Sequence, residues 1–171
     1  MHLRFPNRFF VLFIWVMVCC SVASAAIEAQ FIEGAPKDEF VIWNSGPCPI
    51  SDASLLIDLS SSNGQLIFDV SEHGGGVEVY QPFELTDGEQ ALGELPIVQD
   101  GQNQLQLKIT HLAAGARIAF TIDVDDTIGQ REITVSGAEI EGATLSISSE
   151  SFRAVGAFSS DSYTALEAPE C

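Results

Sequence analysis

Residues 117–127 alternate apolar and polar side chains more regularly than any other stretch of this 171-residue chain. The apolar members stand at every second position: Ile118, Phe120, Ile122 and Val124. In an extended backbone successive side chains point to opposite faces, so these four would share one face of a sheet. The segment therefore predicts a β-strand with one side turned to a core and a polar side that ends in aspartates.

The rest of the chain also carries the signals of short strands and turns. Glycine, serine, asparagine and aspartate interrupt short runs of valine, isoleucine, leucine, phenylalanine and threonine at near-regular intervals. No window of a dozen residues repeats apolar side chains at the helical spacing i, i+3, i+4, i+7, and glycines keep the most helix-like stretch, 82–92, short. We expect strands at 39–43, 55–59, 66–70, 77–80, 104–109, 117–125, 133–135, 145–147 and 152–158.

Strands with one apolar face each need a second layer to cover that face. We therefore predict an all-β fold: a two-layer antiparallel β-sandwich, immunoglobulin-like or jelly-roll-like, in a single domain. Two pairs of neighbouring strands are expected to form hairpins, 55–59 with 66–70 and 104–109 with 117–125, because short turn-forming segments separate them.

Residues 1–25 have the composition of a secretory signal peptide. Two arginines precede an uninterrupted apolar run at 9–18, and the small residues at 23–25 suit a signal peptidase. The alternative is a membrane anchor, which needs about 20 apolar residues to cross the hydrocarbon layer, and this run is shorter. We expect cleavage after Ala25, a secreted or periplasmic domain of residues 26–171, and no membrane insertion after cleavage.

The sequence is strongly acidic. Its 24 aspartates and glutamates stand against 7 lysines and arginines, a formal net charge of −17, and removal of the two leader arginines makes the charge −19. A surface of this sign repels nucleic-acid phosphates and anionic lipid head groups. Nucleic acid is therefore not expected as a partner, and the charged partners that fit are cations or basic surfaces. The alternative is that the acidic residues only keep an exported protein soluble.

Two cysteines, Cys48 and Cys171, remain once the leader is removed. Exported chains meet an oxidising compartment, so a Cys48–Cys171 disulfide is predicted, with two unrelated free thiols as the alternative. The bridge would tie the C-terminus to an early strand and stabilise the fold by about 5 kcal/mol through restriction of the unfolded chain. Two cysteines without CxxC spacing do not point to a zinc site.

Acidic residues gather at the end of the strand predicted at 117–125. Asp123 and Asp125 would lie on one face about 7 Å apart, and Asp126 follows where the strand ends. Carboxylates suit Ca²⁺, which takes about six to eight oxygen ligands. Two carboxylates 7 Å apart repel by only roughly 0.6 kcal/mol in water, so solvated carboxylates are the alternative. Further calcium ligands would come from acidic residues near the first strand: Asp38, Glu39 and Glu33.

Other residue types with functional potential are sparse. Trp43 and Tyr80 are candidates for ligand binding by stacking on sugar rings, although aromatic residues in apolar strands are more often buried in a core. His73 and His111 lie beside predicted strands, but the sequence has no G-x-S-x-G or H-E-x-x-H motif around a histidine or serine. The residues therefore do not point to an enzyme.

Five segments together form a recognisable pattern: 31–38, 66–70, 76–83, 118–127 and 135–140. They read FIEGAPKD, LIFDV, GVEVYQPF, IAFTIDVDDT and VSGAEI. This pattern resembles small exported bacterial proteins labelled aggregation factor core, a label taken from sponge adhesion factors that assemble cells through calcium and glycans. The resemblance covers most of residues 31–145. It implies a secreted β-rich adhesion or matrix module and brings no catalytic residues.

These observations predict a secreted or periplasmic binding or adhesion module of a cell surface or matrix, with Ca²⁺ as its cofactor. Its partner would be a cell-surface glycan or protein. One alternative is a hydrolase of polysaccharide or peptidoglycan that uses paired carboxylates such as Glu33 and Asp123. Another is a structural module that self-associates through its strand edges.

Overall fold

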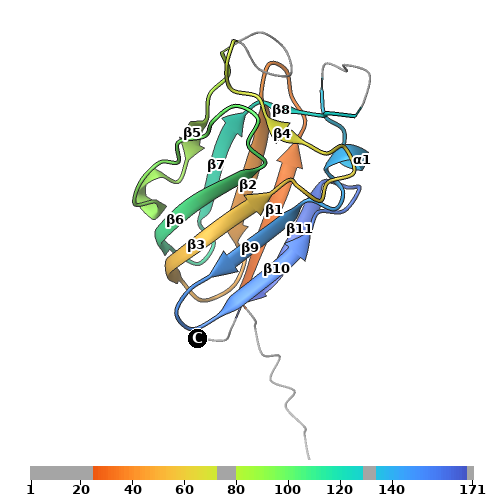
Figure 1. Ribbon diagram of the computed structural model, residues 1–171. Coiled ribbons are helices and arrows are strands. Elements are labelled where there is room, and N and C mark those ends of the chain that lie inside the picture. The colour runs from red at the N-terminus through yellow and green to blue at the C-terminus, as the bar shows by residue number, and fades with distance from the viewer. Residues whose placement is uncertain (1–24, 73–79, 129–133, 169–171) are drawn as a thin grey trace, which may run out of the picture.

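The computed structural model describes residues 25–72, 80–128 and 134–168. Two antiparallel sheets pack face to face in these residues, and Figure 1 shows the two layers with their connecting loops at both ends. The predicted all-β fold and its two-layer antiparallel β-sandwich are therefore confirmed.

Each sheet combines strands from both halves of the sequence. In hydrogen-bonded order, the five-stranded sheet consists of β11 (Tyr163–Ala168), β1 (Ala25–Ile32), β2 (Asp38–Asn44), β7 (Arg117–Ile122) and β5 (Glu84–Asp87). The four-stranded sheet consists of β10 (Arg153–Ala157), β9 (Thr144–Ser148), β3 (Ile50–Asp58) and β6 (Gln104–Leu112). A small third sheet pairs β4 (Ile67–Phe68) with β8 (Val124–Asp125). The described helical turns are η1 (Glu89–Ala91) and α1 (Gly137–Ile140).

Alternate residues of the two large sheets form one hydrophobic core. On β2 and β7, the side chains of Phe40, Ile118 and Phe120 are fully buried, and the rings of Phe40 and Phe120 stack with their centroids 5.3 Å apart. The facing sheet contributes Leu55 and Leu107, which are also fully buried. Burying one such side chain contributes roughly 1.5–3 kcal/mol. The alternation visible in the sequence therefore supplies the contact between the layers.

The predicted hairpin of 104–109 with 117–125 is wrong. β6 pairs with β3 in one sheet, whereas β7 pairs with β2 and β5 in the other. The connection at 113–116 therefore carries the chain from one layer to the other. A period of two shows which face of a strand is buried but not which strand lies alongside it. Here both strands bury their apolar faces from opposite sides of the same core.

The predicted hairpin of 55–59 with 66–70 is also wrong. In the second segment, Ile67 and Phe68 form β4, which pairs with β8 instead of β3. The helix-like stretch 82–92 contains the edge strand β5 and the single 3-10 turn η1. Parts of two predicted strands, 77–79 and residue 133, lie outside the described residues.

The side chain of Asn44 joins the two connections at one end of the sandwich. Its amide nitrogen donates to the carbonyl oxygens of Cys48 at 2.7 Å and Leu112 at 3.2 Å, and its Oδ1 accepts the N–H of Gly46 at 3.1 Å. Asn44 is fully buried, so Asn44→Ala would leave buried backbone groups without partners. We expect this variant to lose about 2 kcal/mol of unfolding free energy in urea denaturation. A loss below about 0.5 kcal/mol would show that this contact contributes little to stability.

Two predictions concern residues outside the described part of the chain. The signal peptide at 1–25 is one of them, apart from its last residue, Ala25, which is the first residue of β1. Cys171 is also outside, so the Cys48–Cys171 disulfide stays a prediction; Cys48 itself is buried and packs against Phe152. None of the described helices has the length and apolar character needed to span a membrane.

Candidate metal centre

The short strands β4 and β8 close one end of the sandwich, at the top of Figure 1. They pair antiparallel, with Phe68 opposite Val124. Immediately beyond this pair, the N–H of Asp69 donates to the carbonyl oxygen of Asp123 at 3.2 Å. Asp123 and Asp125 stand two positions apart, which places them on one face of an extended backbone. The pairing of β4 with β8 therefore brings together acidic residues that are far apart in the sequence.

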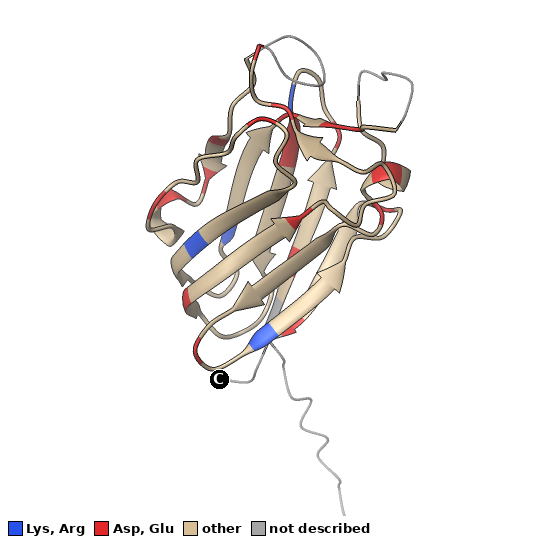
Figure 2. Ribbon diagram, in the orientation of Figure 1, with Lys and Arg blue, Asp and Glu red and all other residues tan. Residues whose placement is uncertain are grey.

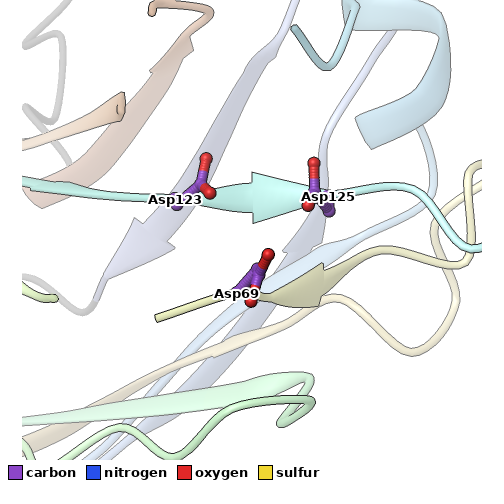
Figure 3. A group of neighbouring side chains, drawn as sticks. All are labelled: Asp69, Asp123 and Asp125. Atoms are coloured by element: carbon purple, nitrogen blue, oxygen red, sulfur yellow. The ribbon is translucent and has the colours of Figure 1, made fainter. Parts of the chain in front are cut away.

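Three carboxylates form the resulting cluster, which we call the three-aspartate site: Asp69, Asp123 and Asp125. One carboxylate oxygen from each residue lies within 4.8 Å of the oxygens of the other two. Figure 3 shows Asp69 pointing toward the segment that carries Asp123 and Asp125. Two oxygens that each lie about 2.4 Å from one Ca²⁺ can be at most about 4.8 Å apart. The spacing therefore allows all three carboxylates to ligate a single ion.

The three-aspartate site is buried, and most of its oxygens lack a hydrogen-bond donor. Asp69 is 0% exposed and Asp123 is 8% exposed, while Asp125 is half-buried. Both carboxylate oxygens of Asp69 and the Oδ2 atoms of Asp123 and Asp125 are buried without a hydrogen-bond partner. Leaving one buried polar atom unsatisfied costs roughly 1–3 kcal/mol. These oxygens therefore need either protons or a cation.

Burial and the charges of neighbouring carboxyls raise the pKa values of Asp69 and Asp123. Burial first, and then the charges of Asp125 and Asp38, raise the pKa of Asp123 to about 7. The pKa of Asp69 is also raised to about 7, by burial and then by the neighbouring carboxyls of Asp100 and Asp125. Such carboxyls resist ionisation until a positive charge compensates for it. The site therefore has the electrostatic character of a set of cation ligands.

The nearby lysine does not neutralise the cluster. Lys37, in the loop between β1 and β2, acts to lower the pKa of Asp123, against the larger effect of burial. Its Nζ forms an ion pair with Glu84 at 2.8 Å and donates to the carbonyl oxygen of Pro82 at 3.0 Å. The charge of Lys37 is therefore shared with another acid. Figure 2 shows acidic segments along this end of the sandwich.

Asp69 is the member of the three-aspartate site that sequence reasoning did not find. Its position beside Asp123 depends on the pairing of β4 with β8, which local alternation does not determine. A weak signal was present, because Asp69 is a single charged residue between Phe68 and Val70, which are both buried. A charge inside a buried apolar run is retained where it is paired or binds a metal.

The three-aspartate site contains two of the six residues predicted as calcium ligands, Asp123 and Asp125, and the other four lie outside it. Asp126 is half-buried, and its Oδ1 accepts the N–H of Ile128 at 3.1 Å. Glu33 is exposed in the loop after β1. Asp38 and Glu39 are consecutive on β2 and so point to opposite faces; Asp38 is buried with the core, and Glu39 is half-buried on the outer face.

The other candidate residues do not belong to the three-aspartate site. Trp43 is half-buried on the outer face of β2, and Tyr80 is 65% exposed. The Nδ1 atom of His111 is hydrogen-bonded with the Oγ atom of Ser51 at 2.9 Å on an exposed surface. His73 lies outside the described residues. Ligand binding by Trp43 or Tyr80 therefore stays a prediction.

The hydrolase alternative pairs Glu33 with Asp123, and these two carboxylates lie in different environments: Glu33 is exposed and Asp123 is buried. A surface cavity of about 590 Å³ lies beside β5, lined by residues 83–90 and Leu95, and neither carboxylate is among them.

Comparison with known proteins finds no family model, no curated protein and no solved structure that matches this chain.

Proposed function

We propose that this chain is an exported β-sandwich module that binds Ca²⁺ at the three-aspartate site and acts by binding at a cell surface or in an extracellular matrix. The observation that carries the proposal is Asp69, a fully buried carboxylate whose two oxygens lack hydrogen-bond partners and which points toward two further carboxylates. Buried charges are retained where they are paired or coordinate a metal. Export is supported by the leader-like composition of residues 1–25.

The donor set favours Ca²⁺ over other common cations. All three donors are carboxylates, whereas protein zinc sites are built mainly from cysteine sulfur and histidine nitrogen. Mg²⁺ demands near-ideal octahedral geometry at about 2.0–2.1 Å, while Ca²⁺ accepts irregular oxygen sites at about 2.3–2.6 Å. Three carboxylates on two short, irregular segments suit the less demanding ion.

The role at a surface rests on the charge of the chain and on its resemblance to aggregation factor core proteins. A chain with a formal charge of −17 is repelled by acidic surfaces. Bound Ca²⁺ would offset part of that charge and stiffen the end of the sandwich that carries it. The partner would be a cell-surface glycan or protein, or a second copy of the chain.

Thermal unfolding of the secreted protein in the presence of Ca²⁺ tests the metal-binding part of the proposal. At a Ca²⁺ concentration 100-fold above Kd, the folded state should gain about 2.7 kcal/mol. For a domain of this size, that gain raises Tm by roughly 5–11 °C. Mg²⁺ at the same concentration should give a smaller rise. An unchanged Tm at millimolar Ca²⁺ would argue against the site.

A matched control separates the site from the general acidity of the chain. Asp52→Asn removes one negative charge from an exposed position at the start of β3, where the backbone has a φ of 49° that asparagine also adopts. This variant should keep the full rise in Tm.

Retention of labelled protein on whole cells tests the adhesive part of the proposal. Retention should be greater in Ca²⁺ than in chelator, and equal retention in both would contradict calcium-dependent binding.

A further inference from the structure

Asp38 makes the contact that shapes the backbone of the three-aspartate site. It is the first residue of β2, and it is 2% exposed. Its Oδ2 accepts the N–H of Val124 at 3.1 Å, and its Oδ1 accepts the N–H of Gly34 at 3.1 Å. Val124 stands between Asp123 and Asp125 in the chain. One carboxylate group therefore connects the loop after β1 to the peptide bond between Asp123 and Val124, next to one ligand and one residue away from another.

This contact lies where the backbone leaves one sheet and enters another. The ladder between β2 and β7 ends at the pair of Asp38 with Ile122. Beyond that pair the chain continues into β8, which belongs to the small sheet with β4. The Asp38 side chain accepts the Val124 N–H at the point where β2 no longer runs alongside. The Asp38 side chain therefore holds the backbone in the conformation that brings the carboxylates of Asp123 and Asp125 close to Asp69.

We infer that Asp38 is a positioning residue of the cation site and does not ligate the ion. The inference rests on the proposed calcium binding, and it changes the role expected of Asp38 from ligand to support. Each of its oxygens already accepts a backbone N–H, whereas Asp69 has two oxygens without partners. Groups that hold metal ligands in place typically contribute about 10- to 100-fold to metal affinity.

The test compares Asp38→Asn with the wild-type protein in two measurements. Calorimetric titration with Ca²⁺ gives the affinity, and the luminescence lifetime of bound Tb³⁺ in H₂O and D₂O gives the number of waters on the ion. Asparagine keeps one acceptor oxygen and loses the other, so one of the two backbone contacts breaks. We expect the Ca²⁺ affinity to fall about tenfold or more while the number of waters on Tb³⁺ stays the same as in the wild type.

Two control variants distinguish positioning from other causes. Asn44→Ala alters the opposite end of β2 and weakens the fold there, so it should leave the Ca²⁺ affinity within about twofold. Glu33 is exposed, and its charge acts on Asp38. The change in Ca²⁺ affinity of Glu33→Gln therefore measures the effect of losing one nearby negative charge. The affinity loss of Asp38→Asn should exceed the losses of both controls.

The outcomes separate this inference from the proposed function. Failure of the wild-type protein to bind Ca²⁺ and Tb³⁺ would remove the proposed function itself. If the wild type binds, an unchanged affinity in Asp38→Asn, or a gain of about one water on Tb³⁺, would overturn the positioning role. If Asp38→Asn does not fold, the ¹³C carboxyl resonances of the wild type distinguish a ligand from a positioning residue. The resonances of Asp69, Asp123 and Asp125 should shift when Ca²⁺ is added. An equally large shift of the Asp38 resonance would make Asp38 a ligand and overturn the inference.

Discussion

Replacement of Asp69 by asparagine is expected to make the ion-free protein more stable and to abolish its response to Ca²⁺. Asp69 is fully buried among other carboxyls and has no hydrogen-bond donor. The neutral amide removes the like-charge repulsion with Asp125 and Asp100, and its N–H groups can donate to those carboxylates. Each buried oxygen that gains a donor recovers roughly 1–3 kcal/mol, so ion-free Tm should rise by several degrees.

In the same variant, the gain of about 2.7 kcal/mol expected of the wild type at 100-fold Kd should disappear, because one of three ligands is lost. Differential scanning calorimetry with Ca²⁺ and with chelator measures both effects, and Asp52→Asn is the matched change of charge. A variant less stable than the wild type without Ca²⁺ would mean that Asp69 has an unrecognised structural partner. A variant that keeps the full calcium response would place the ion elsewhere.

The ion-free protein is also expected to lose stability as the pH rises from about 4 to about 8. Burial, more than any other cause, raises the pKa values of Asp38, Asp69 and Asp123 to about 7, against an ordinary value of 3.8. Between these two pH values the folded chain holds protons that the unfolded chain has released. The stability that these groups contribute is therefore fully present below pH 3.8 and is lost as the pH passes through about 7. One pKa unit corresponds to about 1.4 kcal/mol, so a single such group changes stability by about 4 kcal/mol across this range.

Calcium should act in the opposite sense, because the ion competes with protons for the same oxygens. The rise in Tm caused by a fixed Ca²⁺ concentration should be small at pH 5 and large at pH 8. Melting curves at several pH values, with Ca²⁺ and with chelator, measure this difference. The pH dependence in chelator should be shallower in Asp69→Asn. If the wild-type protein in chelator gains stability between pH 5 and pH 7.5, then Asp38, Asp69 and Asp123 are not protonated in the folded state over this range.

Local alternation was a reliable guide to which side chains are buried. Ile118, Phe120 and Ile122 are fully buried and Val124 is 2% exposed, as their spacing predicted. The reason is that alternation depends on consecutive residues of one extended strand, and burial of alternate residues follows once any second layer covers that face. The acidic end of the strand at 117–125 was visible for the same reason.

The strand partners and the place of Asp69 in the three-aspartate site were not visible in this way. The segments 104–109 and 117–125 look like a hairpin in sequence, but their strands lie in different sheets. Several of the described strands, among them β2, β3, β6, β7 and β9, present one apolar face, so many pairings satisfy the pattern equally well. The choice among them depends on the packing of the whole sandwich.

The sequence by itself determined that this chain forms a two-layer sandwich of short strands with aspartates at the end of one of them, because both properties belong to residues that are neighbours in the chain. Tertiary structure decided that Asp69 joins Asp123 and Asp125, and that Asp38 holds the amide of Val124. Both contacts join segments far apart in the sequence: the first depends on the pairing of β4 with β8, and the second lies at the end of the ladder between β2 and β7. Such contacts depend on how complete layers pack, which no short stretch of sequence specifies.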